Sequence, residues 1–405
     1  MQHHHGEPWQ SPDAAKVINT EQDAIDAAHA VAALAMGEAA QRDRQRIYPL
    51  EALALFSRSG LGSISVPAAL GGGGLSYRTV AEVFRIISAA DPSLGQIPQN
   101  HFGIIQFILD QGTAAQQRDL LGAVVAGQRL GNGGPEKNTR HTRDVRARLQ
   151  QREEGLRLTG EKFYSTGALF AHIVVTTALD DDGAAVMIFV PRLSAGLTVI
   201  DDWSGMGQRT TASGTVRFQE VTVDASRVIP LPTDEKPSLR GAVSQLIQAA
   251  IDAGIGRGAF DEACEFVRHH SRPWIDANVE RNADDPHLQA DVGRVFTELH
   301  AAEALLRRAA RIVDECRGSS LTAEEAARAS VAVAEAKVLT TRIALKASEK
   351  LLEWGGSRAT LSEHGLDRHW RNARTHTLHD PVRWKYHAIG NYYLNGIFPA
   401  RHAWI

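Results

Sequence analysis

At its centre the chain reads Ile173-Val174-Val175-Thr176-Thr177 and then Ala185-Val186-Met187-Ile188-Phe189-Val190. Such β-branched and aromatic residues favour strands, and polar turn residues bound both runs. Similar short runs occur at 145–149, 156–160, 196–200 and 214–218. Because these runs are closely spaced and no helical pattern separates them, they predict an antiparallel barrel or sandwich rather than a Rossmann sheet.

Helical patterns flank this central region on both sides. Before residue 130, Ala, Leu, Ile, Glu and Gln recur at helical spacing, and a Pro-rich linker at 230–237 precedes three long apolar-periodic segments. Those segments, at 242–266, 287–316 and 322–352, predict a bundle of about four antiparallel helices. We therefore expect an α+β fold with a helical domain at 1–130, an antiparallel β-barrel domain at 131–236 and a four-helix bundle domain at 237–405.

Composition excludes several classes of function. The 405 residues include 44 Lys and Arg against 47 Asp and Glu, a net charge of −3, which gives no electrostatic basis for binding nucleic acid or a membrane surface. The longest apolar stretch, 331–345, contains three charged residues and is too short to span a bilayer. The start of the chain lacks the apolar core of a signal peptide, and there are two cysteines, so we expect a cytoplasmic protein. The histidines at 3–5 are assigned no function.

Common catalytic motifs are missing. His376, His379 and the adjoining Asp380 are the one tight cluster of candidate metal ligands, but no Cys or Glu pair completes a zinc set, so we expect no metal. No Gly-x-Ser-x-Gly segment or strand-linked Gly-x-Gly-x-x-Gly segment occurs. The glycines at 254–258 lie inside a predicted helix, where helix packing explains them best.

Three local segments carry more information. Residues 131–136 read Gly-Asn-Gly-Gly-Pro-Glu, and small residues there let the backbone approach a ligand beside Asn132. In residues 160–167 a predicted strand ends in Tyr164, Ser165, Thr166 and a glycine. Such a segment is suited to contact the edge of an isoalloxazine ring. The third segment, 371–381, contains both clustered histidines and follows the Glu-Trp-Gly-Gly sequence at 353–356.

With these segments in this order, the chain resembles the acyl-CoA dehydrogenase superfamily over nearly its whole length. Residues 61–67 with the glycines at 71–74 resemble the family's N-terminal segment, and 162–167 match its segment at the flavin. Residues 206–214 match its Gly-x-Arg turn, and 351–356 resemble its Gly-Gly loop. The resemblance implies a flavoprotein with the three-domain architecture described above.

One departure from the family pattern bears on function. Acyl-CoA dehydrogenases commonly use a Glu base near the C-terminus, whereas this chain has Asp380, one methylene shorter and followed by Pro381. The Glu-Pro-x-x-Gly-Ser-Asp run is replaced as well, by residues 135–140. The segment 374–382, Arg-Thr-His-Thr-Leu-His-Asp-Pro-Val, is instead similar to the flavin-dependent monooxygenase branch that includes dibenzothiophene monooxygenase and sulfur-acquisition oxidoreductases.

The resemblance also implies site residues. The candidate catalytic residues are His379, which would hold or protonate the flavin peroxide, and His376, Thr166, Asn132 and, by a looser match, His101. The candidate cofactor-binding residues are Asn132, Tyr164, Ser165, Thr166, an aromatic wall at Trp203, a phosphate-binding Arg272 acting across a subunit boundary, Gly355 and Gly356.

The activity implied by the resemblance is that of an FMNH₂-dependent monooxygenase. It would use O₂ through a flavin C4a-hydroperoxide to oxygenate a small organosulfur or related compound, as a homotetramer supplied with reduced FMN by a separate NAD(P)H:flavin reductase. FAD is the alternative cofactor. Two other functions stay open, an FAD-dependent acyl-CoA dehydrogenase with Asp380 as base and a non-catalytic flavin-fold binding protein.

Overall fold

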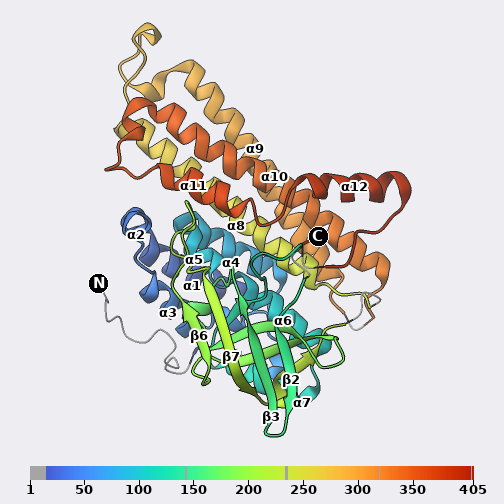
Figure 1. Ribbon diagram of the computed structural model, residues 1–405. Helices are drawn as coiled ribbons and strands as arrows, with labels where there is room; N and C mark the ends of the chain where they lie inside the picture. The colour runs from blue at the N-terminus through green and yellow to red at the C-terminus, as the bar shows by residue number, and fades with distance from the viewer. Residues whose placement is uncertain (1–14, 142–143, 233–235, 319, 403) are drawn as a thin grey trace.

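The computed structural model describes residues 15–141, 144–232, 236–318, 320–402 and 404–405 (Figure 1). The histidines at 3–5 and part of the expected linker at 230–237 lie outside these residues. Helices come first, strands occupy the middle of the chain, and helices return to the end, as the sequence predicts. No helix in the described part of the chain is both long and apolar enough to cross a membrane.

The N-terminal helices pack around one apolar core. Side-chain caps begin several of them: Thr20 accepts a hydrogen bond from the backbone of Asp23, and Thr113 forms a reciprocal capping box with Gln116. The buried faces of these helices carry Ala, Val, Ile, Leu and Phe. The helices are α1 (Glu21–Met36), α2 (Ala39–Gln45), α3 (Leu50–Arg58), α4 (Tyr77–Ala90), α5 (Pro92–Gln96), α6 (Gln99–Gln111) and α7 (Ala114–Val125).

The central strands form one eight-stranded sheet. Its strands are β1 (Leu130–Gly133), β2 (Arg148–Arg152), β3 (Gly155–Lys162), β4 (Ile173–Leu179), β5 (Ala185–Pro191), β6 (Leu197–Ile200), β7 (Thr215–Val223) and β8 (Val228–Pro230). They lie in the order β6-β7-β3-β2-β4-β5-β8, with β1 beside β4. All six predicted strands are present, and the sequence analysis missed β1 in the Gly-rich segment and β8 at the expected linker.

The expectation of an antiparallel barrel needs correction, because the sheet is mixed. β1 pairs with β4 in parallel, and β2 meets β4 in parallel through Arg148 and Leu179. The other pairings are antiparallel. β1 follows directly from the helical region, and its parallel pairing fixes Asn132 beside the middle of the buried strand β4.

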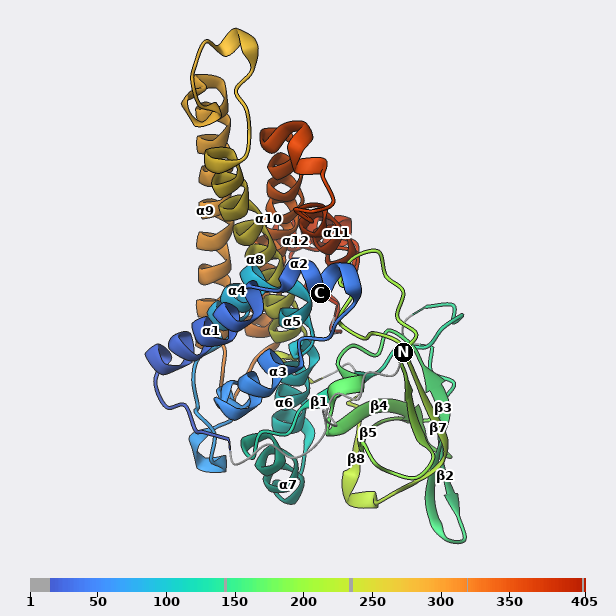
Figure 2. The ribbon, with the colours of Figure 1, turned by 90° about the vertical axis from the view of Figure 1, so that its left-hand side faces the viewer.

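Three long helices dominate the C-terminal region. α8 (Arg240–His269), α9 (Pro286–Glu315) and α10 (Ala323–Gly355) lie side by side and project well beyond the sheet (Figures 1 and 2). α11 (Asp367–His376) and α12 (Arg383–Asn395) are much shorter and pack against the long helices. The arrangement is therefore three long helices with two short ones rather than the expected four-helix bundle.

Glycines in α8 allow it to approach the N-terminal helices closely. A Cβ on Gly254 would lie 2.5 Å from the carbonyl oxygen of Arg85, and one on Gly258 would lie 2.2 Å from that of Ala89. The predicted packing role of these glycines is confirmed. α8 also contacts α5, and the buried Asp252 lies on α8 two residues before Gly254.

Candidate active site

A chain of buried polar side chains joins four helices. The His376 ring, at the end of α11, is fully buried and its Nδ1 lies 2.5 Å from Oδ1 of Asp252 on α8. The other carboxylate oxygen of Asp252 accepts hydrogen bonds from Lys337 Nζ (2.7 Å) and Thr341 Oγ1 (2.9 Å), both on α10. Three donors around one carboxylate offset the cost of burying its charge and keep it ionised.

Gln96, the last residue of α5, continues this chain to the second histidine. Its Oε1 lies 3.1 Å from Nε2 of His376, and its Nε2 lies 3.2 Å from Nε2 of His379. His379 Nδ1 is 2.7 Å from the backbone oxygen of His376, one turn earlier. Gln96 and His376 are buried, whereas His379 is exposed on one side, so His379 is the member of the row that a bound molecule can reach.

The surroundings shift the pKa values within this row. Burial lowers the pKa of His376, although the neighbouring Asp252 acts in the opposite direction. The pKa of His379 also falls below its usual value, because protein behind the ring displaces water and His376 lies close by. Asp252 is buried too, but Lys337 and His376 hold its pKa well below the usual range.

Local sequence explains why Gln96 is held so firmly. Asp91 caps α5 by accepting hydrogen bonds from the backbone of Ser93 (3.0 Å) and Leu94 (3.2 Å), and Pro92 occupies the first turn. An ion pair of 2.9 Å from Arg42 holds Asp91 in place. A Cβ on Gly95 would lie 2.1 Å from Oγ of Ser88, so α5 lies almost against α4.

Asp380 follows His379 in the sequence and forms an ion pair with a lysine. It is buried, and its Oδ2 lies 3.1 Å from Nζ of Lys385, which is also buried. Burial lowers the pKa of Lys385, although the neighbouring Asp380 carboxylate acts in the opposite direction. The carboxylate that the dehydrogenase alternative needs as a free base is therefore neutralised by an internal cation.

Hydroxyl groups from the sheet region form a second polar row. Thr166 Oγ1 lies 2.7 Å from Ser213 Oγ, which lies 2.8 Å from Thr211 Oγ1. A Cβ on Gly167, whose φ is +76°, would lie 2.7 Å from the carbonyl oxygen of Ile97. Since Ile97 follows Gln96, the hydroxyl row and the histidine row meet at this contact.

Asn132 and Tyr164, two of the predicted cofactor-binding residues, are joined by a hydrogen bond. Asn132 Oδ1 accepts a hydrogen bond from the backbone of Gly134 (3.2 Å), and its Nδ2 donates to the carbonyl oxygen of Tyr164 (3.3 Å). Tyr164 is more than half exposed and has a φ of +56°, in the left-handed region that costs an ordinary residue about 1–3 kcal/mol. Strain of this kind is concentrated at binding sites in many proteins, and it presents the Tyr164 ring outward.

A loop from the sheet connects this region to α11. Trp203 donates from Nε1 to the carbonyl oxygen of Gln208 (2.8 Å), and Asn372 accepts from the backbone N–H of Gln208 (2.6 Å). The Trp203 ring lies 6.2 Å from that of Tyr164, centre to centre, in an edge-on arrangement. The rings of Trp203 and Tyr164 thus lie next to each other, and Asn372, one turn before His376, holds the loop that carries Trp203 against α11.

Several buried polar atoms around this loop have no hydrogen-bond partner among the described residues. They include Oγ of Ser165, both amide atoms of Gln208, Nε of Arg374 and Oγ1 of Thr375. Both carboxylate oxygens of Asp380 also lack a hydrogen bond, although Oδ2 forms the ion pair with Lys385. Buried polar atoms normally have partners, so such a group suggests a polar ligand. Their donors and acceptors, together with the hydroxyl row, suit the carbonyl and nitrogen edge of a flavin ring.

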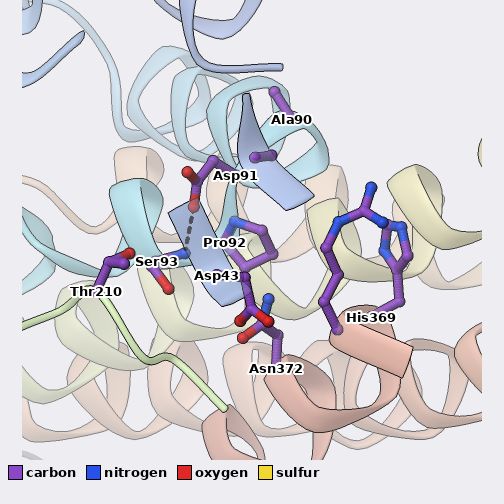
Figure 3. A pocket seen from close by; sticks show the side chains of 10 residues that line it. Asp43, Ala90, Asp91, Pro92, Ser93, Thr210, His369 and Asn372 are labelled. Atoms are coloured by element: carbon purple, nitrogen blue, oxygen red, sulfur yellow. Dashed lines mark hydrogen bonds between the residues drawn. The ribbon is translucent and has the colours of Figure 1, made fainter. Parts of the chain in front are cut away.

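A small polar cavity lies beside the row, lined by α2, α5, the loop at Thr210 and α11 (Figure 3). Figure 3 shows Asp43 and Asn372 close together, with Asp91 bonded to the backbone of Ser93 on the other side. The volume of the cavity is about 10 Å³, enough for one water molecule. A flavin ring cannot fit there, so the exposed side of His379 is the better candidate for the cofactor. No group of three or more His, Cys, Asp or Glu in the described residues could hold a metal ion.

His101 is the one predicted catalytic residue that belongs to a different environment. Its Nε2 lies 2.9 Å from the carbonyl oxygen of Gly62, and its Nδ1 accepts from the backbone of Leu130 (3.0 Å). Burial lowers the pKa of His101 to about 4, which keeps the ring neutral. With both nitrogens bound to backbone groups, His101 joins α6 to the start of β1 and has no nitrogen left for a ligand.

Arg272, which is expected to hold the phosphate, and the predicted cofactor-binding residues Gly355 and Gly356 lie at the ends of long helices. Arg272 is exposed in the loop after α8, and Gly355 and Gly356 end α10. Asn282 links the two segments, since its Nδ2 lies 2.8 Å from Ser271 Oγ and 3.2 Å from the carbonyl oxygen of Trp354. The structure thus brings the segments that carry Arg272 and the Gly-Gly loop together, at one end of α8 and α10.

Comparison with known proteins agrees with this architecture. Residues 19–128 match the acyl-CoA dehydrogenase N-terminal domain, and residues 246–384 match the acyl-CoA dehydrogenase C-terminal domain. Dibenzothiophene monooxygenase from Rhodococcus erythropolis is 34% identical over 357 residues, which cover 84% of this chain and 86% of that protein. The chain belongs to the flavin-dependent monooxygenase branch of the acyl-CoA dehydrogenase family. The predicted family and enzyme class are confirmed.

Two further relatives bear on the cofactor. The probable FMNH2-dependent monooxygenase SfnC from Pseudomonas putida is 30% identical over 350 residues, 84% of this chain and 87% of that protein. FMN-bound TdsC from Paenibacillus sp. A11-2 has a TM-score of 0.89 and 33% identity, covering 94% of this chain and all of that one, and TdsC was also solved with FMN and indole. These relatives support the prediction of FMN rather than FAD.

Gln96, Asp252 and Lys337 are the functional candidates that sequence reasoning missed. Asp252 interrupts an otherwise apolar helical segment, whereas Lys337 lies between Glu335 and Arg342 in its own segment. A single charged residue in an apolar helical segment predicts a buried ion pair, because such a charge is buried only with a partner. Gln96 carries no comparable signal in the sequence.

Proposed function

We propose that this protein is a two-component, FMNH₂-dependent monooxygenase that oxygenates a small organosulfur compound. The observation that carries the proposal is the row of His376, Gln96 and His379, next to the Asp380 that the dehydrogenase alternative would use as its base. Imidazole and amide groups donate and accept hydrogen bonds without adding an anion. Such a row suits a site that stabilises reduced oxygen rather than one that removes an α-proton from a thioester.

The pairing of Asp380 supports this choice over the acyl-CoA dehydrogenase alternative. A general base needs an accessible lone pair near its substrate, whereas Asp380 is buried and paired with Lys385 at 3.1 Å. Freeing Asp380 would leave the ammonium of Lys385 buried without its partner, at a cost of about 3–5 kcal/mol.

The unpartnered atoms of Ser165, Gln208 and Thr375 would hold the ring of FMN. Reduced FMN, when bound, supplies the two electrons with which O₂ is split, one oxygen atom going to sulfur and the other leaving as water. We propose that His379, on the exposed side of the row, supplies a proton from Nε2, which carries one when the Gln96 amide turns its oxygen toward it. Thr166 and Asn132 would orient the ring by hydrogen bonding, while Tyr164 and Trp203 would exclude water.

We also propose that the active form is a homotetramer, a dimer of dimers, in the cytoplasm. Arg272, Gly355 and Gly356 would then bind the FMN phosphate of a neighbouring subunit, since a guanidinium binds phosphate in a bidentate way. Exposed apolar side chains support an interface at the C-terminus, namely Trp384, Tyr386, Tyr393, Leu394, Ile397 and Phe398. A separate NAD(P)H:flavin reductase would supply the reduced FMN.

The test mixes the purified protein with photoreduced FMN, O₂ and a panel of small sulfides and thiophenes, and measures oxygenated product and H₂O₂. The proposal predicts product in the presence of FMN. Bleaching of bound FAD by an acyl-CoA thioester, without oxygenation, would instead support the dehydrogenase. Flavin binding with neither reaction would support the non-catalytic alternative.

A further inference from the structure

The Gln96 amide lies between the His376 and His379 rings and contacts Nε2 of each. The Nδ1 atom of each ring already has another partner. His376 Nδ1 lies 2.5 Å from an oxygen of Asp252, and His379 Nδ1 lies 2.7 Å from the backbone oxygen of His376. Asp252 is ionised, and a carboxylate or a carbonyl oxygen only accepts hydrogen bonds. Both Nδ1 atoms must therefore carry a hydrogen.

This arrangement determines the number of protons on the pair. A ring with hydrogen on Nδ1 is neutral only if its Nε2 is a bare acceptor. Two neutral rings would present two acceptors to Gln96, which has one donor group and one acceptor oxygen. The amide oxygen needs a donor, so one ring must carry a second hydrogen whichever way the amide faces. In the orientation found here that ring is His376, and a half-turn of the amide would assign the charge to His379.

We propose that Gln96 is a positioning residue that keeps one excess proton on the His376–His379 pair and determines which ring holds it. His376 stores the proton next to Asp252, in the interior. His379 is the exposed ring, and a half-turn of the amide together with movement of one proton places the excess proton on the ring that a bound molecule can reach. The assignment of the proton stands on the geometry alone, and its use in oxygenation rests on the proposed function.

Charged groups around the pair leave this proton as the net charge. Asp252 and Lys337 lie behind His376 as one ion pair, and Asp380 and Lys385 form a second pair nearby. The charges within each pair cancel, so the excess proton gives the cluster a charge of +1. Burial disfavours that charge, whereas the contact of His376 with Asp252 favours it. Burial lowers the pKa of both rings. The pair keeps its excess proton at neutral pH because the Gln96 oxygen requires a hydrogen-bond donor.

The direct test is ¹⁵N NMR of the full-length, cofactor-free protein labelled in histidine, with His376 and His379 assigned from single substitutions. At pH 7.5, above the usual histidine pKa, the wild type should show one imidazolium and one neutral ring protonated on Nδ1. Gln96→Met removes both hydrogen bonds at similar volume and should leave two neutral rings. Gln96→Glu presents two acceptor oxygens and should make both rings imidazolium.

Gln99→Met is the matched control, because Gln99 is equally buried, lies three residues away and bonds only Ser244 among the described residues. It should leave the histidine spectrum unchanged. Two neutral rings in the wild type at pH 7.5, or an imidazolium that survives in Gln96→Met, would overturn the inference. The wild-type spectrum alone decides the matter if a variant does not fold.

The functional consequence is measured separately, as the ratio of oxygenated product to H₂O₂ with reduced FMN. Gln96→Met should lower this ratio about tenfold or more while Gln99→Met leaves it unchanged. If the wild-type spectrum shows the imidazolium but no substrate is oxygenated, the proposed function fails and the role of Gln96 stands. If oxygenation occurs in a protein whose two rings are neutral, the role of Gln96 fails and the function stands.

Discussion

Asp380 and Lys385 form an ion pair in the interior, with Oδ2 3.1 Å from Nζ and both side chains nearly inaccessible to solvent. Lys385 also donates to the backbone oxygen of Trp404, so the pair ties the segment after α11 to the end of the chain. The carboxylate that the dehydrogenase alternative would use as its base therefore has a structural partner.

This relationship predicts a stability effect for Asp380→Asn. The substitution leaves the Lys385 ammonium buried without its counter-ion and should lower the free energy of unfolding by about 3 kcal/mol. Chemical denaturation at fixed protein concentration measures it. The double variant Asp380→Asn, Lys385→Met should recover part of the loss. A single variant as stable as the wild type would show that the pair contributes nothing.

His379→Ala should separate cofactor binding from oxygenation. The ring lies at the exposed end of the row, and its removal should leave FMN affinity nearly intact while product formation falls about 100-fold or more and H₂O₂ rises. FMN titration and product analysis check the two effects. His29→Ala, at an exposed position of α1, is the control. Product formation at the wild-type rate in His379→Ala would remove His379 from the mechanism.

Gly167 tests the contact between the hydroxyl row and α5. Gly167→Ala forces a Cβ onto a residue with φ of +76°, 2.7 Å from the carbonyl oxygen of Ile97, and should cost about 2–3 kcal/mol. Gly183 has a similar φ of +79° but nothing within 4 Å of its Cβ position, so Gly183→Ala should cost about 1 kcal/mol. Thermal unfolding compares the two variants. Equal losses would mean that the contact with Ile97 adds nothing.

His101 should make the fold sensitive to acid. Its folded pKa is about 4 against about 6.5 in the unfolded chain, because burial disfavours the charged ring. Between pH 6.5 and 4 the unfolded chain binds the proton and the folded protein does not, so stability falls as pH falls through this window, by up to about 3 kcal/mol. His101→Gln should be less stable at pH 7 but lose less on acidification, as measured by denaturation at several pH values. An unchanged slope would contradict this assignment.

Much of the fold was predictable because its signals are local. The short runs from 145 to 218 each became a strand, since alternation and β-branched residues act within a few positions. β1 was missed because Gly131 and Gly133 disfavour a strand, and only pairing with β4 stabilises it. The parallel pairing of β1 was not predictable for the same reason, since it depends on contacts more than 40 residues apart in the chain.

The candidate site was only partly predictable. His376 and His379 stood out as a pair because they are close in sequence. Gln96 is 280 positions from His376, and nothing near Gln96 indicates chemistry until α5, α8 and α11 pack together. Segment resemblance likewise selected His101, whose two ring nitrogens turn out to bind backbone groups. Only tertiary packing shows that Gln96 joins the candidate site and that His101 does not, and single segments of sequence do not reveal that packing.

The most direct test of the central claim is oxygen transfer from O₂ to sulfur. The purified protein, photoreduced FMN and dibenzothiophene or a smaller sulfide are mixed under ¹⁸O₂, and the product is analysed by mass spectrometry. Our account predicts a product that carries one ¹⁸O atom per oxygenation, formed only when both reduced FMN and the protein are present. Reoxidation of FMN to give H₂O₂ without labelled product from any sulfur compound of the panel would contradict it.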